Sequence, residues 1–115
     1  MVTLKIDGQK SVSDFKKEFN HTFPFLKIEL LKKASNEVKG KMSYVALAPN
    51  QPLGKDSIHL EIDDQTSVSR LKTLLLNELG IVCHVYRKSG SIWIEISLTN
   101  DWSLSKQNNE AEQMN

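Results

Sequence analysis

Residues 4–16, LKIDGQKSVSDFK, and residues 60–72, LEIDDQTSVSRLK, are identical at eight of thirteen positions when they are aligned at an offset of 56. Each stretch begins with alternating apolar residues, as a half-buried strand does, and then reaches a turn. Ser11 and Ser67 follow the turns as helix N-cap residues, because a serine oxygen can accept from free backbone N–H groups. The sequence therefore predicts two copies of one strand-and-helix unit.

Apolar residues recur at helical spacing after both serines, and each series ends near a residue that stops helices, Pro24 or Gly80. The two series are Val12, Phe15, Phe19 and Phe23, and Val68, Leu71, Leu75 and Leu79. A second extended segment follows each helix, FLKIELLKK and then IVCHVYRK, and the second copy adds the strand SIWIEISLT. We predict an α+β two-layer sandwich of ferredoxin-like type, an internally duplicated βαβ–βαββ with both helices on one face of a single sheet.

The chain has 115 residues, 39% of them hydrophobic, which suits one domain with a modest core. The last residues are polar, and we expect them to form a short helix that frays, held at its start by Trp102 and Leu104. The expected parts are a single α+β domain at 1–102, copies at about 1–33 and 57–89, a linker at 34–56, an added strand at 91–99 and a polar C-terminal tail at 103–115.

The composition excludes several classes of protein. Fifteen basic and fourteen acidic residues nearly cancel, and the lone Cys83 excludes a disulfide within the chain. The first twenty residues carry charges throughout, unlike a signal peptide, and the longest uncharged run is short and broken by prolines. We therefore expect a cytoplasmic protein that does not enter a membrane.

The stretch YRKSGSIW is typical of a β-hairpin with a glycine in its tight loop. A two-residue Ser-Gly loop predicts that Tyr86 lies opposite Trp93 and that His84 lies opposite Glu95. These four side chains then share one face of the sheet. The other face would carry the residues beneath the helices, which are Cys83, Val85, Ile92, Ile94, Ile96 and Leu98.

The face that carries the two rings has no helix left to cover it, because both helices are expected on the opposite side. One interpretation is that the rings stack across the strands and are covered by the linker or the tail. The other is that the face binds a partner, since rings on a rigid sheet offer contact area at low entropic cost. We favour a non-catalytic interaction module that binds a protein partner or a second copy of itself. The predicted binding residues are Tyr86, Arg87, Lys88, Trp93, His84, Glu95 and Lys5.

Single-stranded nucleic acid is the alternative ligand. Rings on an open sheet with Arg87, Lys88 and Lys5 nearby suit base stacking and phosphate neutralisation. Glu61 and Glu95 on the same face would repel phosphate, and a pI near 7.8 is not that of a basic module. A protein partner therefore ranks first.

The sequence predicts no catalytic site, metal or cofactor, and no enzyme activity. His84 and Glu95 supply two ligands at most, His59 is the only third candidate, and a solvated polar pair is the favoured interpretation. Cys83 adjoins His84 in sequence, but neighbouring residues of a strand point to opposite faces, so we expect the thiol in the core. Phosphate-binding loops, HExxH and serine-elbow motifs are absent.

The segment YRKSGSIWIEISLTNDWSLSKQN resembles the ending of a functionally uncharacterised family of small bacterial proteins. In that family an RKSG turn is followed by a Trp, a Thr, a second Trp and a QN pair. The residues that carry the resemblance are Arg87 to Gly90, Trp93, Thr99, Trp102, Gln107 and Asn108. The resemblance concerns the final fifth of the chain and implies a cytoplasmic bacterial protein, but it implies no activity.

Overall fold

The computed structural model describes residues 2–34 and 43–115. The elements in chain order are β1 (Thr3–Asp7), α1 (Val12–Thr22), β2 (Leu26–Lys33), β3 (Tyr44–Ala46), β4 (His59–Asp63), α2 (Val68–Leu79), β5 (Val82–Ser89), β6 (Ile92–Glu95) and α3 (Leu104–Gln113). Within these ranges no helix has the length and apolar character that crossing a membrane requires. The α+β class predicted from the sequence is confirmed.

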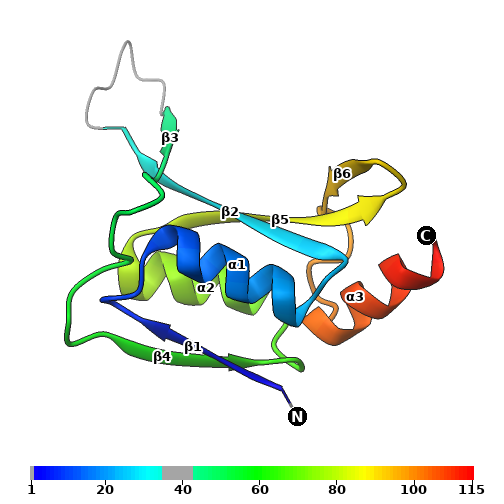
Figure 1. Ribbon diagram of the computed structural model, residues 1–115, viewed down its shortest axis with the longest axis horizontal. Coiled ribbons are helices and arrows are strands. Elements are labelled where there is room, and N and C mark those ends of the chain that lie inside the picture. The colour runs from blue at the N-terminus through cyan, green and yellow to red at the C-terminus, as the bar shows by residue number, and fades with distance from the viewer. Residues whose placement is uncertain (1, 35–42) are drawn as a thin grey trace.

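The strands form two antiparallel sheets. One contains only β1 and β4, and the other has the strand order β3-β2-β5-β6. Helices α1 and α2 lie between the two sheets, so the fold has three layers (Figure 1). The prediction of a single sheet within a two-layer sandwich is therefore wrong.

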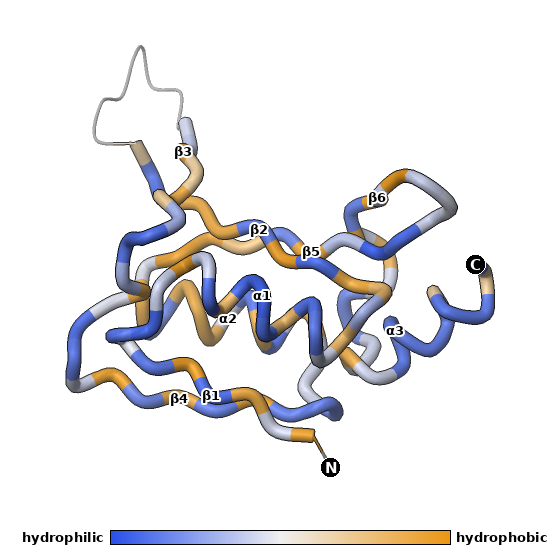
Figure 2. Tube along the Cα trace, in the orientation of Figure 1, coloured by the Kyte–Doolittle hydropathy of each residue, from blue (hydrophilic) through white to orange (hydrophobic). Residues whose placement is uncertain are grey.

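The middle layer buries apolar side chains against both sheets. Phe15 and Phe19 of α1 are fully buried, and Leu71 and Leu75 occupy the matching places in α2. The inward positions of the strands complete the core, namely Leu4, Ile6 and Ile62 from the small sheet and Leu26, Ile28, Leu30, Cys83 and Val85 from the large one. Figure 2 shows apolar segments on the helices and on the strands of both sheets. Helical spacing identifies these side chains, but it does not show that they contact two sheets rather than one.

The small sheet pairs the equivalent strands of the two copies. Lys5 of β1 lies opposite Glu61 of β4 at the centre of the pairing, and only these two positions are related by the offset of 56. The N-cap serines form similar contacts, since Ser11 bridges to Pro52 and Ser67 bridges to Ser103. Each copy therefore includes a segment that crosses the start of its own helix.

The described part of the segment predicted as a linker contains regular structure. Strand β3 pairs with the end of β2, Leu47 and Leu53 are buried, and Val45 is exposed. Residues 35–42 of this segment lie outside the described residues. In the second copy β6 pairs with β5, as β3 pairs with β2 in the first copy. The strand that was predicted as an addition to the second copy therefore has a counterpart in the first.

Helix α3 occupies the segment predicted as a tail. Ser103 caps its N-terminus by accepting from the Lys106 amide, and Leu104 and Ala111 are buried. Gln107 is fully buried, and its Nε2 donates to the carbonyl of Thr99 at 2.6 Å and to its hydroxyl at 2.7 Å. One side of the helix therefore packs against the rest of the fold, which the polar composition of the segment did not predict.

The C-terminal end of α3 is tied to the large sheet. The Phe25 amide donates to Asn108 Oδ1 at 2.9 Å. Asn115 accepts from the Gly90 amide at 2.8 Å and donates to the Lys88 carbonyl at 2.9 Å. These bonds support the β5–β6 hairpin from the side on which the helices lie (Figure 1).

Candidate binding site

The loop of the β5–β6 hairpin consists of Gly90 and Ser91, because Ser89 pairs with Ile92. Gly90 has φ 61° and occupies the first loop position, where the tight turns preferred by hairpins need a positive φ. The sequence-based prediction placed the glycine second in the loop. That choice displaced the predicted pairing by two residues.

In the observed register Tyr86 lies opposite Glu95, and Lys88 lies opposite Trp93. The predicted pairing of Tyr86 with Trp93 and of His84 with Glu95 is therefore wrong. A displacement of two residues keeps every side chain on its predicted face, because side chains alternate with a period of two. The two rings consequently share the face of the sheet that points away from the helices.

Lys27 completes the aromatic group. It lies opposite Tyr86 on β2, and its Nζ is 5.3 Å from the centroid of the Tyr86 ring and 5.3 Å from that of Trp93. Both rings are half-buried. A cation in this position gains about 0.5–1 kcal/mol at an exposed site. The face therefore presents two rings with a lysine bound against them, and Lys27 was not among the predicted binding residues.

Two carboxylates lie beside the rings. His84 Nδ1 is 3.2 Å from Glu95 Oε2, although the two groups are not aligned for a hydrogen bond. Glu29 lies opposite His84 and accepts from Lys16 Nζ at 3.0 Å. Partial burial, followed by the charges of Glu95 and Glu29, raises the pKa of Tyr86. The phenol therefore remains neutral at physiological pH.

Three of the predicted binding residues, Lys88, Arg87 and Lys5, do not lie together. Lys88 is exposed on the same face as the rings. Arg87 points to the opposite face, where it lines a cavity of about 300 Å³ with Ile94 and Leu98. Lys5 belongs to the small sheet, across the helical layer from the hairpin (Figure 1), and it cannot act together with Tyr86.

The hairpin also exposes aliphatic side chains on its other face. Ile92 is 59% exposed, Ile94 is 42% exposed and Leu98 is 95% exposed, although all three were expected beneath the helices. Ile96 is buried as predicted, as are Cys83 and Val85 of β5. The hairpin extends past the ends of α1 and α2 (Figure 1), so these two helices do not cover Ile92 and Ile94.

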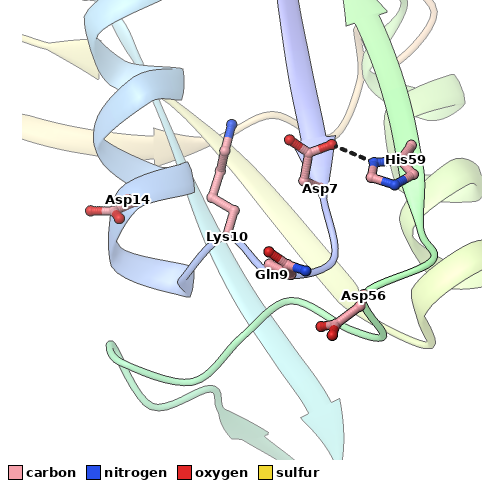
Figure 3. A pocket seen from close by; sticks show the side chains of 6 residues that line it. All are labelled: Asp7, Gln9, Lys10, Asp14, Asp56 and His59. Atoms are coloured by element: carbon pink, nitrogen blue, oxygen red, sulfur yellow. Dashed lines mark hydrogen bonds and ion pairs between the residues drawn. The ribbon is translucent and has the colours of Figure 1, made fainter.

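A second group of polar residues lies at the end of the small sheet, around a cavity of about 450 Å³ (Figure 3). His59 Nδ1 is 3.0 Å from Asp7 Oδ1, and this hydrogen bond lowers the pKa of Asp7. Asp14 and Asp56 line the same cavity, but their carboxylates point away from this pair. Within residues 2–34 and 43–115, no group of three histidines, cysteines or acids could hold a metal ion.

The residues considered for chemistry are separated. His59 lies on the small sheet and His84 on the large one, so His59 cannot be a third ligand beside His84 and Glu95. Cys83 is buried as strand alternation predicts, and burial raises the pKa of its thiol to about 12. A thiol with this pKa is a poor nucleophile at neutral pH.

Comparison of the chain with protein-family models, with curated proteins and with solved structures finds no match. The candidate binding site is therefore the surface of the β5–β6 hairpin together with the adjoining strand β2.

Proposed function

We propose that the protein is a non-catalytic interaction module that binds a protein partner, or a second copy of itself, through the outer face of the large sheet and the tip of the β5–β6 hairpin. The observation that carries this proposal is the position of Tyr86 and Trp93. Both rings lie on the sheet face opposite the helices, on a hairpin whose other side exposes Ile92 and Ile94.

The physical support is the combination of rigidity and apolar surface. Tyr86 lies where β5 is paired on both sides, with Lys27 of β2 and Glu95 of β6 as its neighbours, so its backbone is held without a large entropic cost on binding. Half-buried aromatic side chains and arginine are the residue types that dominate the energy of protein interfaces. Lys27 and Glu95 add charges of both signs, which suits a polar rim around the rings.

A photocrosslinking amino acid at Lys88 tests the proposal in cells. It should yield a discrete crosslinked protein, and the variant Y86A/W93A should lose that product while it keeps its melting temperature. The matched control is Tyr44→Ala, which removes an exposed tyrosine from β3 at the opposite edge of the same sheet. A crosslink that persists in Y86A/W93A, or that Tyr44→Ala also removes, would contradict the proposed site.

Single-stranded nucleic acid is the second candidate. Lys27 lies against both rings and Lys88 is beside them, which would allow bases to stack while phosphates are neutralised. Glu29 and Glu95 oppose phosphate on the same face. Titration of labelled oligonucleotides at two salt concentrations decides between the candidates, since phosphate contacts weaken steeply with salt. Absence of salt-dependent binding removes this candidate.

The bacterial family resemblance and the cytoplasmic location are part of the proposal. Several residues that carry the resemblance act in the fold: Gln107 binds Thr99, and Asn108 accepts from the Phe25 amide. Trp102 has Lys106 Nζ 4.3 Å from its ring centroid. These contacts explain the residue types as supports for α3 and the hairpin, and they imply no chemistry.

A further inference from the structure

We propose that two copies of the chain associate through the free edges of their β6 strands, which pair antiparallel and join the two large sheets into one. This inference rests on the proposed function and names its partner as a second copy of the protein. The surface involved is the β6 edge, defined as the outward backbone of residues 91–95 with the side chains of Ile92, Trp93 and Ile94.

The β6 edge has free backbone groups. Strand β6 is the last strand of the large sheet, and in the part of the chain that the structure describes only β5 pairs with it. The Ile96 amide donates to the Val85 carbonyl of β5. Backbone groups alternate sides along an antiparallel strand, so Trp93 and Glu95 direct their N–H and C=O groups outward, and the carbonyl of Ser91, the last loop residue, also points outward.

The β6 edge is only weakly protected against pairing with another strand. Exposed edges are usually protected by short length, charged side chains, proline or a bulge; β6 is short and carries one charge, Glu95, but its sequence IWIE contains no lysine or proline. Ile92 and Ile94 are exposed on one face, and Trp93 is half-buried on the other. By contrast, the edges of the small sheet carry Lys5, His59 and Glu61, which are charged or polar and exposed.

The side chains of the β6 edge are self-complementary about a twofold axis. With Trp93 opposite Trp93 of the second copy, the two tryptophans exchange two backbone hydrogen bonds, and the Glu95 amide of each copy donates to the Ser91 carbonyl of the other. The same register places Ile92 opposite Ile94 of the second copy on the helix side of the sheet. A closed, isologous contact of this kind is the usual symmetry of homodimers. Ile92, Ile94 and Trp93 of each copy then become buried between the two copies.

Sedimentation equilibrium over a range of concentrations tests the association. The weight-average mass should rise from the chain mass of 13.1 kDa toward twice that value. Glu95→Pro removes an outward N–H without removing a bond to β5, so it should weaken the dimer at least about tenfold in Kd, because symmetry removes two hydrogen bonds. Glu95→Ala keeps the N–H and is the matched control, which should still dimerise.

A pair of double variants tests the register. I92K/I94E places opposite charges across the twofold axis and should dimerise, whereas I92K/I94K places like charges there and should stay monomeric. Far-UV circular dichroism and melting temperature at low concentration check that each variant is folded. If both double variants behave alike, the proposed register is refuted.

The outcome for this inference is separate from that for the proposed function. A wild-type chain that stays monomeric at every concentration, or a dimer that Glu95→Pro does not weaken, overturns pairing through β6. In either case a crosslink at Lys88 that depends on Tyr86 and Trp93 would still support binding of a different protein at the same hairpin. A dimer that is lost in Glu95→Pro and kept in Glu95→Ala supports the β6 edge.

Discussion

Replacing Gly8 with alanine should destabilise the fold much more than a typical surface substitution. Gly8 follows β1 at the point where residues 54–58 cross, and a Cβ atom at this position would overlap the carbonyl oxygen of Lys55. Backbone atoms lie on both sides of the glycine: its amide donates to Ile58 at 2.9 Å, and its carbonyl accepts from the Gly54 amide at 3.0 Å. The crossing segment must therefore move to admit a methyl group.

The expected loss follows from these contacts. Moving the crossing segment breaks or lengthens the two backbone hydrogen bonds, which contribute about 1 kcal/mol each. Displacing packed groups to admit an added carbon costs about 1–3 kcal/mol. Together these effects predict that Gly8→Ala lowers the free energy of unfolding by about 3–5 kcal/mol.

Urea denaturation followed by circular dichroism measures this loss, provided that the m-value is unchanged. Gly90→Ala is the matched control, because Gly90 has a positive φ but no atom within 4 Å of the added Cβ. Its cost is conformational only, about 1 kcal/mol. A loss for Gly8→Ala no larger than that for Gly90→Ala would show that the crossing segment does not approach Gly8 closely and would refute the reasoning.

Three further predictions concern other buried or paired groups. Gln107→Ala should lower the free energy of unfolding by about 2–4 kcal/mol in urea denaturation, because it removes two hydrogen bonds and leaves a cavity, whereas the exposed Asn109→Ala on the same helix should be nearly neutral. The pKa of Asp7 is lowered by its hydrogen bond to His59, so the stability that this bond provides is present above the unfolded carboxyl pKa and is lost as pH falls through the folded one. His59→Ala should raise the pKa of Asp7 toward its ordinary value in a carbon-13 carboxyl titration, and an unchanged titration would contradict the pairing. Cys83 should resist alkylation at pH 8 until the chain is unfolded, because burial raises its pKa to about 12, and rapid labelling of the native protein would contradict its burial.

The local elements could be predicted from the sequence because each depends on neighbouring residues. Ser11 and Ser67 are N-caps as predicted, each accepting a hydrogen bond from the amide three residues on. Gly80 ends α2 in the left-handed conformation that glycine adopts without strain. The two faces of the hairpin were also assigned correctly, because the predicted register was wrong by an even number of residues, although Ile92 and Ile94 on the inner face are exposed.

The arrangement of strands could not be predicted in the same way. Alternating residues show that β1 buries one face, but they do not show whether β1 joins the sheet of β2 or pairs with β4 alone. The single-sheet assumption placed Lys5 beside Tyr86, and the two-sheet structure separates them. A three-layer fold requires the helices to be apolar toward both sheets, and the helical spacing of Val68, Leu71 and Leu75 does not show how many sheets these side chains contact.

The candidate site was predicted in part. Some of its features depend on residues that are close together in the sequence, and others depend on contacts between residues that are far apart. Tyr86 and Trp93 were identified from the hairpin alone. Lys27 belongs to a strand almost sixty residues earlier, and its place against both rings depends on the pairing of β2 with β5. The exposure of Ile92 and Ile94 depends on where the helices end beneath the hairpin, which helical periodicity does not reveal.

Amide hydrogen exchange in dilute and concentrated protein tests most directly the central claim that two copies associate through the β5–β6 hairpin. The outward amides of Trp93 and Glu95 should exchange quickly in the monomer and more slowly as concentration rises. The exposed small-sheet positions Lys5 and Glu61 should show no such change. Exchange at Trp93 and Glu95 that does not depend on concentration, together with new protection in the small sheet, would contradict the account.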